Sequence, residues 1–370
     1  MGAPILKPWP EEPEELSLPL AGRSPLKGLK VGRLISQGQL LAPKTKTGQG
    51  ALRAPLAGTL KSISPLALII TPGPATPMAL EPVDITQLYG AQLAEALSDL
   101  GLNCPEPPSP KTTIPETTIL VSALESEPSL TLSQALWSER PQIMSQGLAM
   151  VSRLYPENPR LLARPRALKA PLDWPSVVVE KPYPWTFGPF LKKSLNLGYE
   201  RLIKGYLTSR DIYLMGLVER QGLPPRHWPL AIQRQNYLVP LGLTPKAIFK
   251  AISLEPGSGD VAVFGGARRG RPWPRLDLGL DLTLANEVMA LDLVRAKNQE
   301  PPLGPCRACG SCRAACPLDL PMDELGRQPL AAWPQLGLLT QKLLALCPDC
   351  GQCALACPAR RPLRYFSSWL

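Results

Sequence analysis

Two cysteine-rich segments decide the organisation of the C-terminal part of the chain: CRACGSCRAACP at residues 306–317 and CPDCGQCALACP at residues 347–358. Each has the spacing C-x2-C-x2-C-x3-C-P, which is typical of bacterial ferredoxins. Three thiolates spaced in this way can curl around one face of an iron–sulfur cubane. The small residues Gly310, Ser311 and Gly351 let the backbone approach and direct N–H groups at the sulfides. The duplicated run predicts two [4Fe–4S] clusters.

The fourth cysteine of each run lies one helical step beyond the third and points away from it. In two-cluster ferredoxins this cysteine ligates the other cluster. We therefore predict crossed ligand sets, which are Cys306, Cys309, Cys312 and Cys357 for the first cluster and Cys347, Cys350, Cys353 and Cys316 for the second.

Zinc sites and disulfides are the alternatives. Structural zinc takes four ligands from paired C-x2-C units, which would leave no role for the regular third and fourth cysteines or for both trailing prolines. A disulfide framework is disfavoured because eight of the nine cysteines lie between residues 306 and 357. The ninth, Cys104, is interpreted as a bystander thiol. Between the runs, residues 336–346 are apolar at helical spacing, which predicts an all-helical module.

The composition narrows the class of protein. The 370 residues include 46 Pro, 29 Gly and 44% hydrophobic residues, enough for a core in about two or three domains. The single histidine, His227, excludes histidine-based metal sites and disfavours Ser–His or Cys–His catalysis. The net charge of +10 indicates an acidic partner or surface. No secretory signal and no run of about 18 apolar residues is visible, so we expect a cytoplasmic chain without a direct membrane span.

The rest of the chain changes pattern three times. Residues 28–63 show short apolar runs between Gly and Pro turns, which predicts an all-β segment. A proline-rich linker follows at 71–82. Residues 83–225 alternate predicted helices, at 86–100 and 139–154, with short apolar strands, which predicts a mostly parallel sheet. Residues 226–290 return to strands around one short helix.

The all-β segment resembles the barrel-sandwich hybrid of biotinyl and lipoyl carriers. A carrier needs a modified lysine at its hairpin tip, typically within Met-Lys-Met. Lys44 and Lys46 lack that context, so we interpret both as solvated.

In this order the parts resemble the RnfC family of Rnf-type electron transport complexes, which is related to the FMN-binding subunit of respiratory complex I. Local matches are LGLTP at 241–245, GGARRG at 265–270, the Glu125–Glu127 segment after a strand, and CPARRPL at 357–363. The resemblance covers about residues 25–365. It implies a multidomain α+β fold, divided into a barrel-sandwich hybrid (1–75), an α/β flavoprotein-like domain (83–225), a β-grasp domain (226–290) and a two-cluster ferredoxin domain (291–370).

One segment departs from that family. Where the family has a glycine-rich loop that cradles the flavin phosphate, residues 100–110 keep one glycine and carry four prolines and Glu106. Proline has no N–H to donate, and Glu106 would repel a phosphate. The segment therefore disfavours a bound FMN and with it NADH oxidation. Glu125 and Glu127, which match acids of the family's flavin and nicotinamide pocket, are interpreted as loop or helix-start acids that remain from it.

Two further features have simple interpretations. His227, between Arg226 and Trp228, is expected to pack on the surface or between domains. The arginine-rich stretch 266–275 is interpreted as a solvated turn or a docking patch for an acidic redox protein, and nucleic acid binding is disfavoured.

The sequence thus predicts an iron–sulfur electron-transfer subunit of a membrane-associated oxidoreductase complex, at the inner face of the cell membrane. Its expected partners are the other subunits and an acidic ferredoxin or flavodoxin. An intact FMN-dependent NADH dehydrogenase or cobalamin-reductase-like flavoenzyme is one alternative. A scaffold protein with purely structural clusters is the other.

Overall fold

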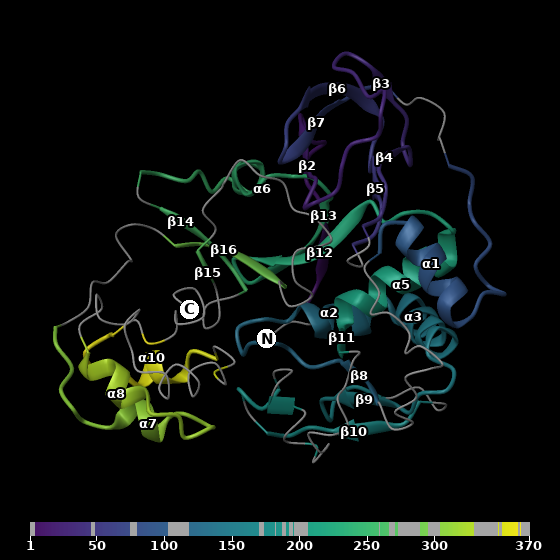
Figure 1. Cartoon of the computed structure of the whole chain (residues 1–370). Helices are drawn as coiled ribbons and strands as arrows, with labels where there is room; N and C mark the ends of the chain where they lie inside the picture. The colour runs from purple at the N-terminus through teal and green to yellow at the C-terminus, as the bar shows by residue number, and fades with distance from the viewer. Residues whose placement is uncertain are drawn as a thin grey trace.

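The computed structural model contains three larger β-sheets, one small sheet and several helices, so the fold is mixed α/β, as predicted (Figure 1). The structure describes residues 4–45, 49–74, 80–102, 118–169, 174–181, 183–186, 190–191, 195, 206–258, 260–265, 271–272, 289–294, 304–328, 347, 350–361 and 363. Among these, no helix is long and apolar enough to cross a bilayer.

The N-terminal segment forms an antiparallel sheet of four strands in the order β2-β7-β6-β3 and a hairpin of two. These strands are β2 (Leu16–Pro19), β3 (Leu34–Ile35), β4 (Leu40–Ala42), β5 (Leu52–Arg53), β6 (Gly58–Ile63) and β7 (Ala67–Pro72). Their shortness follows from the Gly and Pro residues between them, which interrupt regular pairing. The expectation of short strands over residues 28–63 is confirmed.

The second sheet is fully parallel, with the order β10-β9-β8-β11. Its strands are β8 (Ile119–Ser122), β9 (Arg160–Arg164), β10 (Ser176–Val178) and β11 (Tyr206–Thr208). All four residues of β8 are buried, as expected for a strand covered on both faces. The parallel sheet was predicted, whereas β9 and β11 were not.

Helices α1 (Gly90–Asp99), α2 (Leu132–Glu139), α3 (Pro141–Leu154) and α5 (Ser209–Gln221) accompany this sheet (Figure 1). The predicted helix at 139–154 is in fact divided, because Pro141 cannot continue α2 and instead begins α3, where its missing N–H costs nothing. Helix α5 begins with a capping box between Thr208 and Asp211. The helix expected over 188–205 falls mostly outside the described residues.

The third sheet has the order β1-β13-β12-β16-β14-β15. Its strands are β1 (Leu6–Pro8), β12 (His227–Ile232), β13 (Gln235–Pro240), β14 (Val261–Phe264), β15 (Arg271–Pro272) and β16 (Ala290–Val294). Helix α6 (Pro245–Ala251) is the expected short helix, and Thr244 caps it by accepting a hydrogen bond from the Ala247 N–H at 3.1 Å.

The N-terminal strand crosses the boundary expected at residue 75. β1 pairs with β13 in parallel, with Leu6 opposite Asn236. The antiparallel sheet also shares one hydrophobic core with the third sheet, in which Leu16, Leu41 and Leu60 pack together with Trp228 and Phe249. The Ser17 N–H donates to the Gly242 carbonyl at 2.8 Å. Residues 6–74 and 226–294 thus form one packed unit, and the parallel sheet lies between them in sequence.

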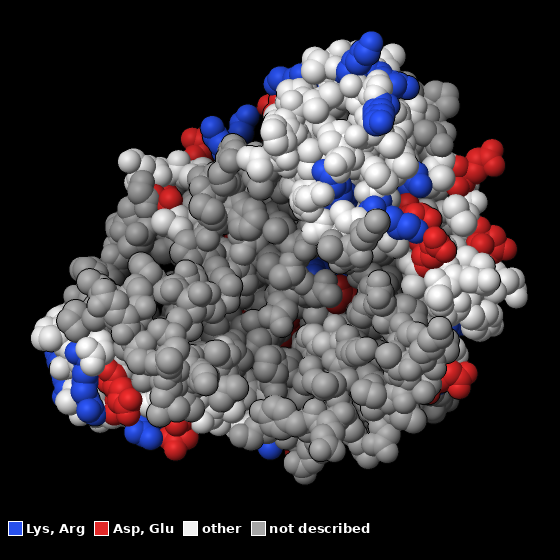
Figure 2. All heavy atoms as spheres, viewed as in Figure 1, with Lys and Arg blue, Asp and Glu red and all other residues white. Residues whose placement is uncertain are grey.

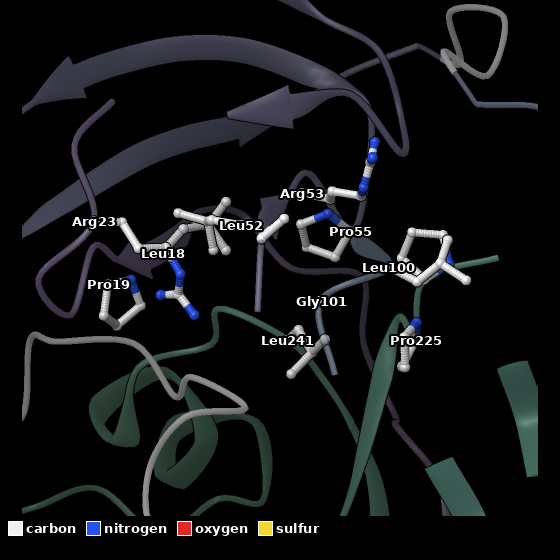
Figure 3. A pocket seen from close by; sticks show the side chains of 12 residues that line it. Leu18, Pro19, Arg23, Leu52, Arg53, Pro55, Leu100, Gly101, Pro225 and Leu241 are labelled. Atoms are coloured by element: carbon white, nitrogen blue, oxygen red, sulfur yellow. The ribbon is translucent and has the colours of Figure 1, made fainter. Parts of the chain in front are cut away.

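A cavity of about 30 Å³ marks the junction of these parts. Leu18, Leu52, Leu100 and Leu241 line it, from four different segments of the chain (Figure 3). The buried Arg23 guanidinium fixes one side by donating to the Gly50 carbonyl at 2.6 Å and to the Leu20 carbonyl at 3.1 Å.

Candidate metal centre

The two cysteine runs fold into matching turns. Helix α7 (Ser311–Ala314) follows Gly310, and helix α10 (Gln352–Ala356) follows Gly351. Both glycines are left-handed, with φ of 72° and 75°, a conformation that glycine adopts at little cost. The second residue of each short helix is the third cysteine of its run, Cys312 or Cys353, and each is 7% exposed. The equal spacing in sequence is therefore matched by equal backbone geometry.

The correspondence extends past the fourth cysteine of each run. After Cys316 the chain passes through Asp319 (φ 51°), and after Cys357 it passes through Arg360 (φ 50°). The following N–H group then returns to the sulfur, with the Leu320 N–H 3.4 Å from Cys316 Sγ and the Arg361 N–H 3.5 Å from Cys357 Sγ. The Ala308 N–H lies 3.3 Å from Cys306 Sγ in the same way. Such donors favour the thiolate, which is the form that ligates metal.

Four cysteines from both runs line one cavity: Cys316, Cys347, Cys350 and Cys353. Phe190, Leu318, Leu320 and Met322 form an apolar wall around it. Burial, and next the nearby thiols Cys347, Cys350 and Cys316, raise the pKa of Cys353. This donor set, thiols alone within an apolar surround, suits an iron–sulfur cluster, which Cys thiolates hold. It is also the set predicted for the second cluster.

The remaining cysteines are less enclosed. Cys309 is exposed and Cys306 and Cys357 are partly exposed, whereas Cys312 is buried. Burial, followed by the charges of Asp323 and Cys357, raises the pKa of Cys312, so Cys357 of the second run lies close to Cys312 of the first. A hydrogen bond with Ser311 is the main influence that lowers the pKa of Cys309. Within the described residues none of the eight cysteines is in a disulfide, and no three His, Cys, Asp or Glu side chains form a single-ion metal site.

The sequence of the C-terminal segment agrees with this geometry. Residues 305–361 match the 4Fe-4S dicluster domain family. This dicluster segment supports the prediction of [4Fe–4S] clusters, while the individual ligand sets stay predictions. No curated protein sequence matches the chain.

Two solved structures are similar to the chain over a longer range. One is an NAD+-reducing [NiFe]-hydrogenase in the H2-reduced state, with 13% identity, a TM-score of 0.41 and coverage of 64% of this chain and 51% of that chain. The same kind of enzyme in the air-oxidised state gives 11% identity, a TM-score of 0.39 and coverage of 63% and 51%. This chain thus spans about half the length of those chains. Likenesses this distant carry no conclusion about this chain.

An aromatic segment that the sequence reasoning missed covers the dicluster segment. The Tyr183 hydroxyl donates to the Cys350 carbonyl at 2.5 Å, and Phe190 lines the cavity. Trp185 and Phe190 meet edge to face, with ring centroids 5.8 Å apart. The signal was present, since residues 183–190 read YPWTFGPF and hold four aromatic residues in a chain where only 6% are aromatic.

Replacing Tyr183 with Phe is expected to lower the reduction potential of one cluster. The hydroxyl is a donor directed at the peptide of a predicted ligand, Cys350, and donors near a cluster stabilise its more negative, reduced state. Redox titration followed by EPR measures this. The outer cluster serves as the internal control, because a shift of both clusters by the same amount would contradict a local effect.

Glu125 and Glu127 both follow β8. The Glu125 carboxylate accepts a hydrogen bond from the Gln134 N–H at 2.9 Å and so caps the N-terminus of α2. This agrees with its interpretation as a helix-start acid. Its Oε2 is buried and makes no hydrogen bond, and burial raises the pKa of Glu125 to about 7. Glu127 is fully buried. The proline-rich segment 105–110, and with it the flavin phosphate loop, lies outside the described residues.

The raised pKa of Glu125 predicts a pH-dependent stability. Below the unfolded value near 4.5 the carboxyl is protonated in both states, so its contribution is fully present, and it is lost as the pH rises through about 7. Glu125→Gln should therefore gain stability relative to the wild type between pH 5 and pH 8, as measured by denaturant unfolding. The exposed Glu157→Gln is the matched control, and an equal gain there would refute the assignment to Glu125.

The other predicted residues lie apart from the cysteines. Lys44 forms ion pairs with Glu95 at 3.2 Å and Asp99 at 3.0 Å on α1, and so differs from the solvated lysine that was predicted. His227 begins β12, and burial with the charge of Arg226 lowers its pKa. Lys46, Cys104 and the arginines of 266–275 apart from Arg271 lie outside the described residues.

Proposed function

We propose that this chain is an electron-transfer subunit that holds two [4Fe–4S] clusters in the crossed arrangement predicted from its sequence. The observation that carries the proposal is the cavity in which Cys316 of the first run lies beside three cysteines of the second. Crossing of this kind is typical of two-cluster ferredoxins. The match of residues 305–361 to the 4Fe-4S dicluster family supports it independently.

The residues around the thiols would set the redox behaviour. When bound, each cluster takes up and releases single electrons. The apolar wall of Phe190, Leu318 and Leu320 excludes water from the inner cluster site. Cys309 leaves the outer site open to solvent. Because exposure and hydrogen bonds to sulfur tune cluster potentials, the two clusters should differ in potential, and the outer one should exchange electrons with a soluble partner.

We further propose that the chain works without a flavin of its own. The four prolines and Glu106 in 105–110 support this, because they remove the N–H donors that a flavin phosphate needs. The order of the parts and the CPARRPL segment support a place in an Rnf-type complex at the inner face of the membrane. The strand order of the third sheet, a hairpin beside two further strands that flank a helix, supports its assignment as a β-grasp domain.

An anaerobic redox titration followed by EPR, with iron, sulfide and flavin quantified, tests the proposal. The expected result is about eight irons per chain, two reversible one-electron transitions and no stoichiometric flavin. Retained FMN together with reduction by NADH would identify a flavoenzyme instead. Clusters that cannot be reduced reversibly would identify a scaffold.

A further inference from the structure

The N-terminal sheet segment has a one-sided charge. Residues 16–80 contain no Asp or Glu, while their Lys and Arg residues are Arg23, Lys27, Lys30, Arg33, Lys44, Lys46, Arg53 and Lys61. This stretch therefore carries most of the chain's net charge of +10. On the lobe that holds β3 and β6, Lys and Arg atoms stand among uncharged surface (Figure 2).

Most of the cations outside residues 26–34 already have partners. Arg23 is buried against carbonyl groups, and Arg53 donates to the Asp99 carbonyl at 2.6 Å. Lys44 pairs with Glu95 and Asp99, and Lys61 pairs with Glu15. The three exposed cations Lys27, Lys30 and Arg33 form no ion pair within the described part of the chain. All three lie in residues 26–34, which we name the basic-aliphatic loop.

Exposed aliphatic side chains alternate with these cations. Leu26 is 37% exposed, Val31 63% and Leu34 66%. Gly28 and Gly32 turn the chain with φ of 91° and 84°, and a side chain at either position would meet open space. The Gly32 N–H donates to the Leu60 carbonyl at 2.8 Å, which fixes the loop beside β6. The loop is therefore anchored, while its aliphatic and basic side chains face solvent.

We propose that the basic-aliphatic loop binds the surface of an anionic phospholipid bilayer. Val31 and Leu34 would enter the boundary between headgroups and acyl chains, and Lys27, Lys30 and Arg33 would contact the lipid phosphates. Shallow apolar insertion combined with cations is the chemistry by which proteins bind anionic membranes without spanning them. The loop belongs to a projecting lobe (Figure 1) and its aliphatic side chains are separated by cations, which fits a fluid lipid surface better than a shaped protein groove.

Binding of the full-length chain to vesicles tests this. Vesicles of phosphatidylcholine with increasing phosphatidylglycerol are expected to bind the chain increasingly, and added salt should weaken the binding by screening. Lys27→Glu/Lys30→Glu should reduce the vesicle affinity at least about tenfold. Val31→Ser/Leu34→Ser should reduce it several-fold while the dependence on salt stays, because only the inserted area is lost.

Lys169→Glu/Lys246→Glu is the matched control, since it changes the net charge equally at two exposed lysines outside the loop. It should keep the wild-type affinity. Equal loss in this control would show attraction by overall charge alone and overturn the proposal. Failure of the wild type to bind phosphatidylglycerol vesicles would do the same and would leave an acidic protein as the partner of the loop. Iron content measured on each variant keeps this test separate from that of the electron-transfer proposal.

Discussion

Cys316→Ala is expected to remove the same cluster as Cys353→Ala, although Cys316 belongs to the other cysteine run. Both side chains line the inner cavity together with Cys347 and Cys350. Loss of one thiolate from four opens the site to water and to loss of iron, so each variant should keep about four of about eight irons. The EPR spectrum of the remaining cluster should be the same in both variants.

The reciprocal variant sharpens this test. Cys357→Ala should resemble Cys309→Ala, because Cys357 acts on the pKa of Cys312 and is assigned to the outer site. Cys104→Ala is the control for cysteine replacement as such and should retain all of its iron. If Cys316→Ala instead resembled Cys309→Ala, each run would hold its own cluster and the crossed assignment would be wrong.

Gly147→Ala and Gly216→Ala are each expected to destabilise the protein strongly. Helices α3 and α5 cross so closely that a Cβ on Gly147 would lie 2.0 Å from the Ile212 carbonyl oxygen. A Cβ on Gly216 would lie 1.9 Å from the Ile143 carbonyl oxygen. The contacts are reciprocal and made by backbone atoms, so no side-chain rotation can relieve them and the helices must separate.

The magnitude follows from two opposing effects. Overpacking costs about 3 kcal/mol, and Ala gains about 1 kcal/mol over Gly in a helix. The net loss of about 2 kcal/mol should lower the melting temperature by about 4–8 °C, measured by circular dichroism. Gly73→Ala is the matched control, because its nearest neighbouring atom would be 3.8 Å away. Melting of the two helix variants at the wild-type temperature would contradict the close crossing.

The sequence predicted best what is encoded locally. The cysteine spacing specified two matching turns because ligand geometry and left-handed glycines act over a few residues. The apolar run at β8 and the proline at the start of α3 specified local structure in the same way. Helices α2 and α5 were missed, since α2 has only eight residues and α5 relies on a Thr208–Asp211 capping box ahead of a face that is not strongly patterned.

Long-range pairing could not be predicted in this way. Nothing in Leu6–Pro8 indicates β13 as its partner, because a three-residue strand fits many sheet edges. The aromatic wall of the inner cavity was missed for the same reason, since Tyr183 and Cys350 are 167 residues apart. Chain closure over such distances is decided by the packing of the whole molecule.

The shared core of the first and third sheets has a consequence for synthesis on the ribosome. The N-terminal strands cannot bury Leu16, Leu41 and Leu60 until β12 to β16 emerge, because Trp228 and Phe249 complete that core. At about 5–20 residues per second, the interval between β7 and β16 lasts on the order of ten to forty seconds. The parallel sheet and its helices, all made in that interval, should fold first. The nascent chain meanwhile exposes an acid-free, aliphatic segment, so we expect this protein to depend on chaperones bound to its first translated third.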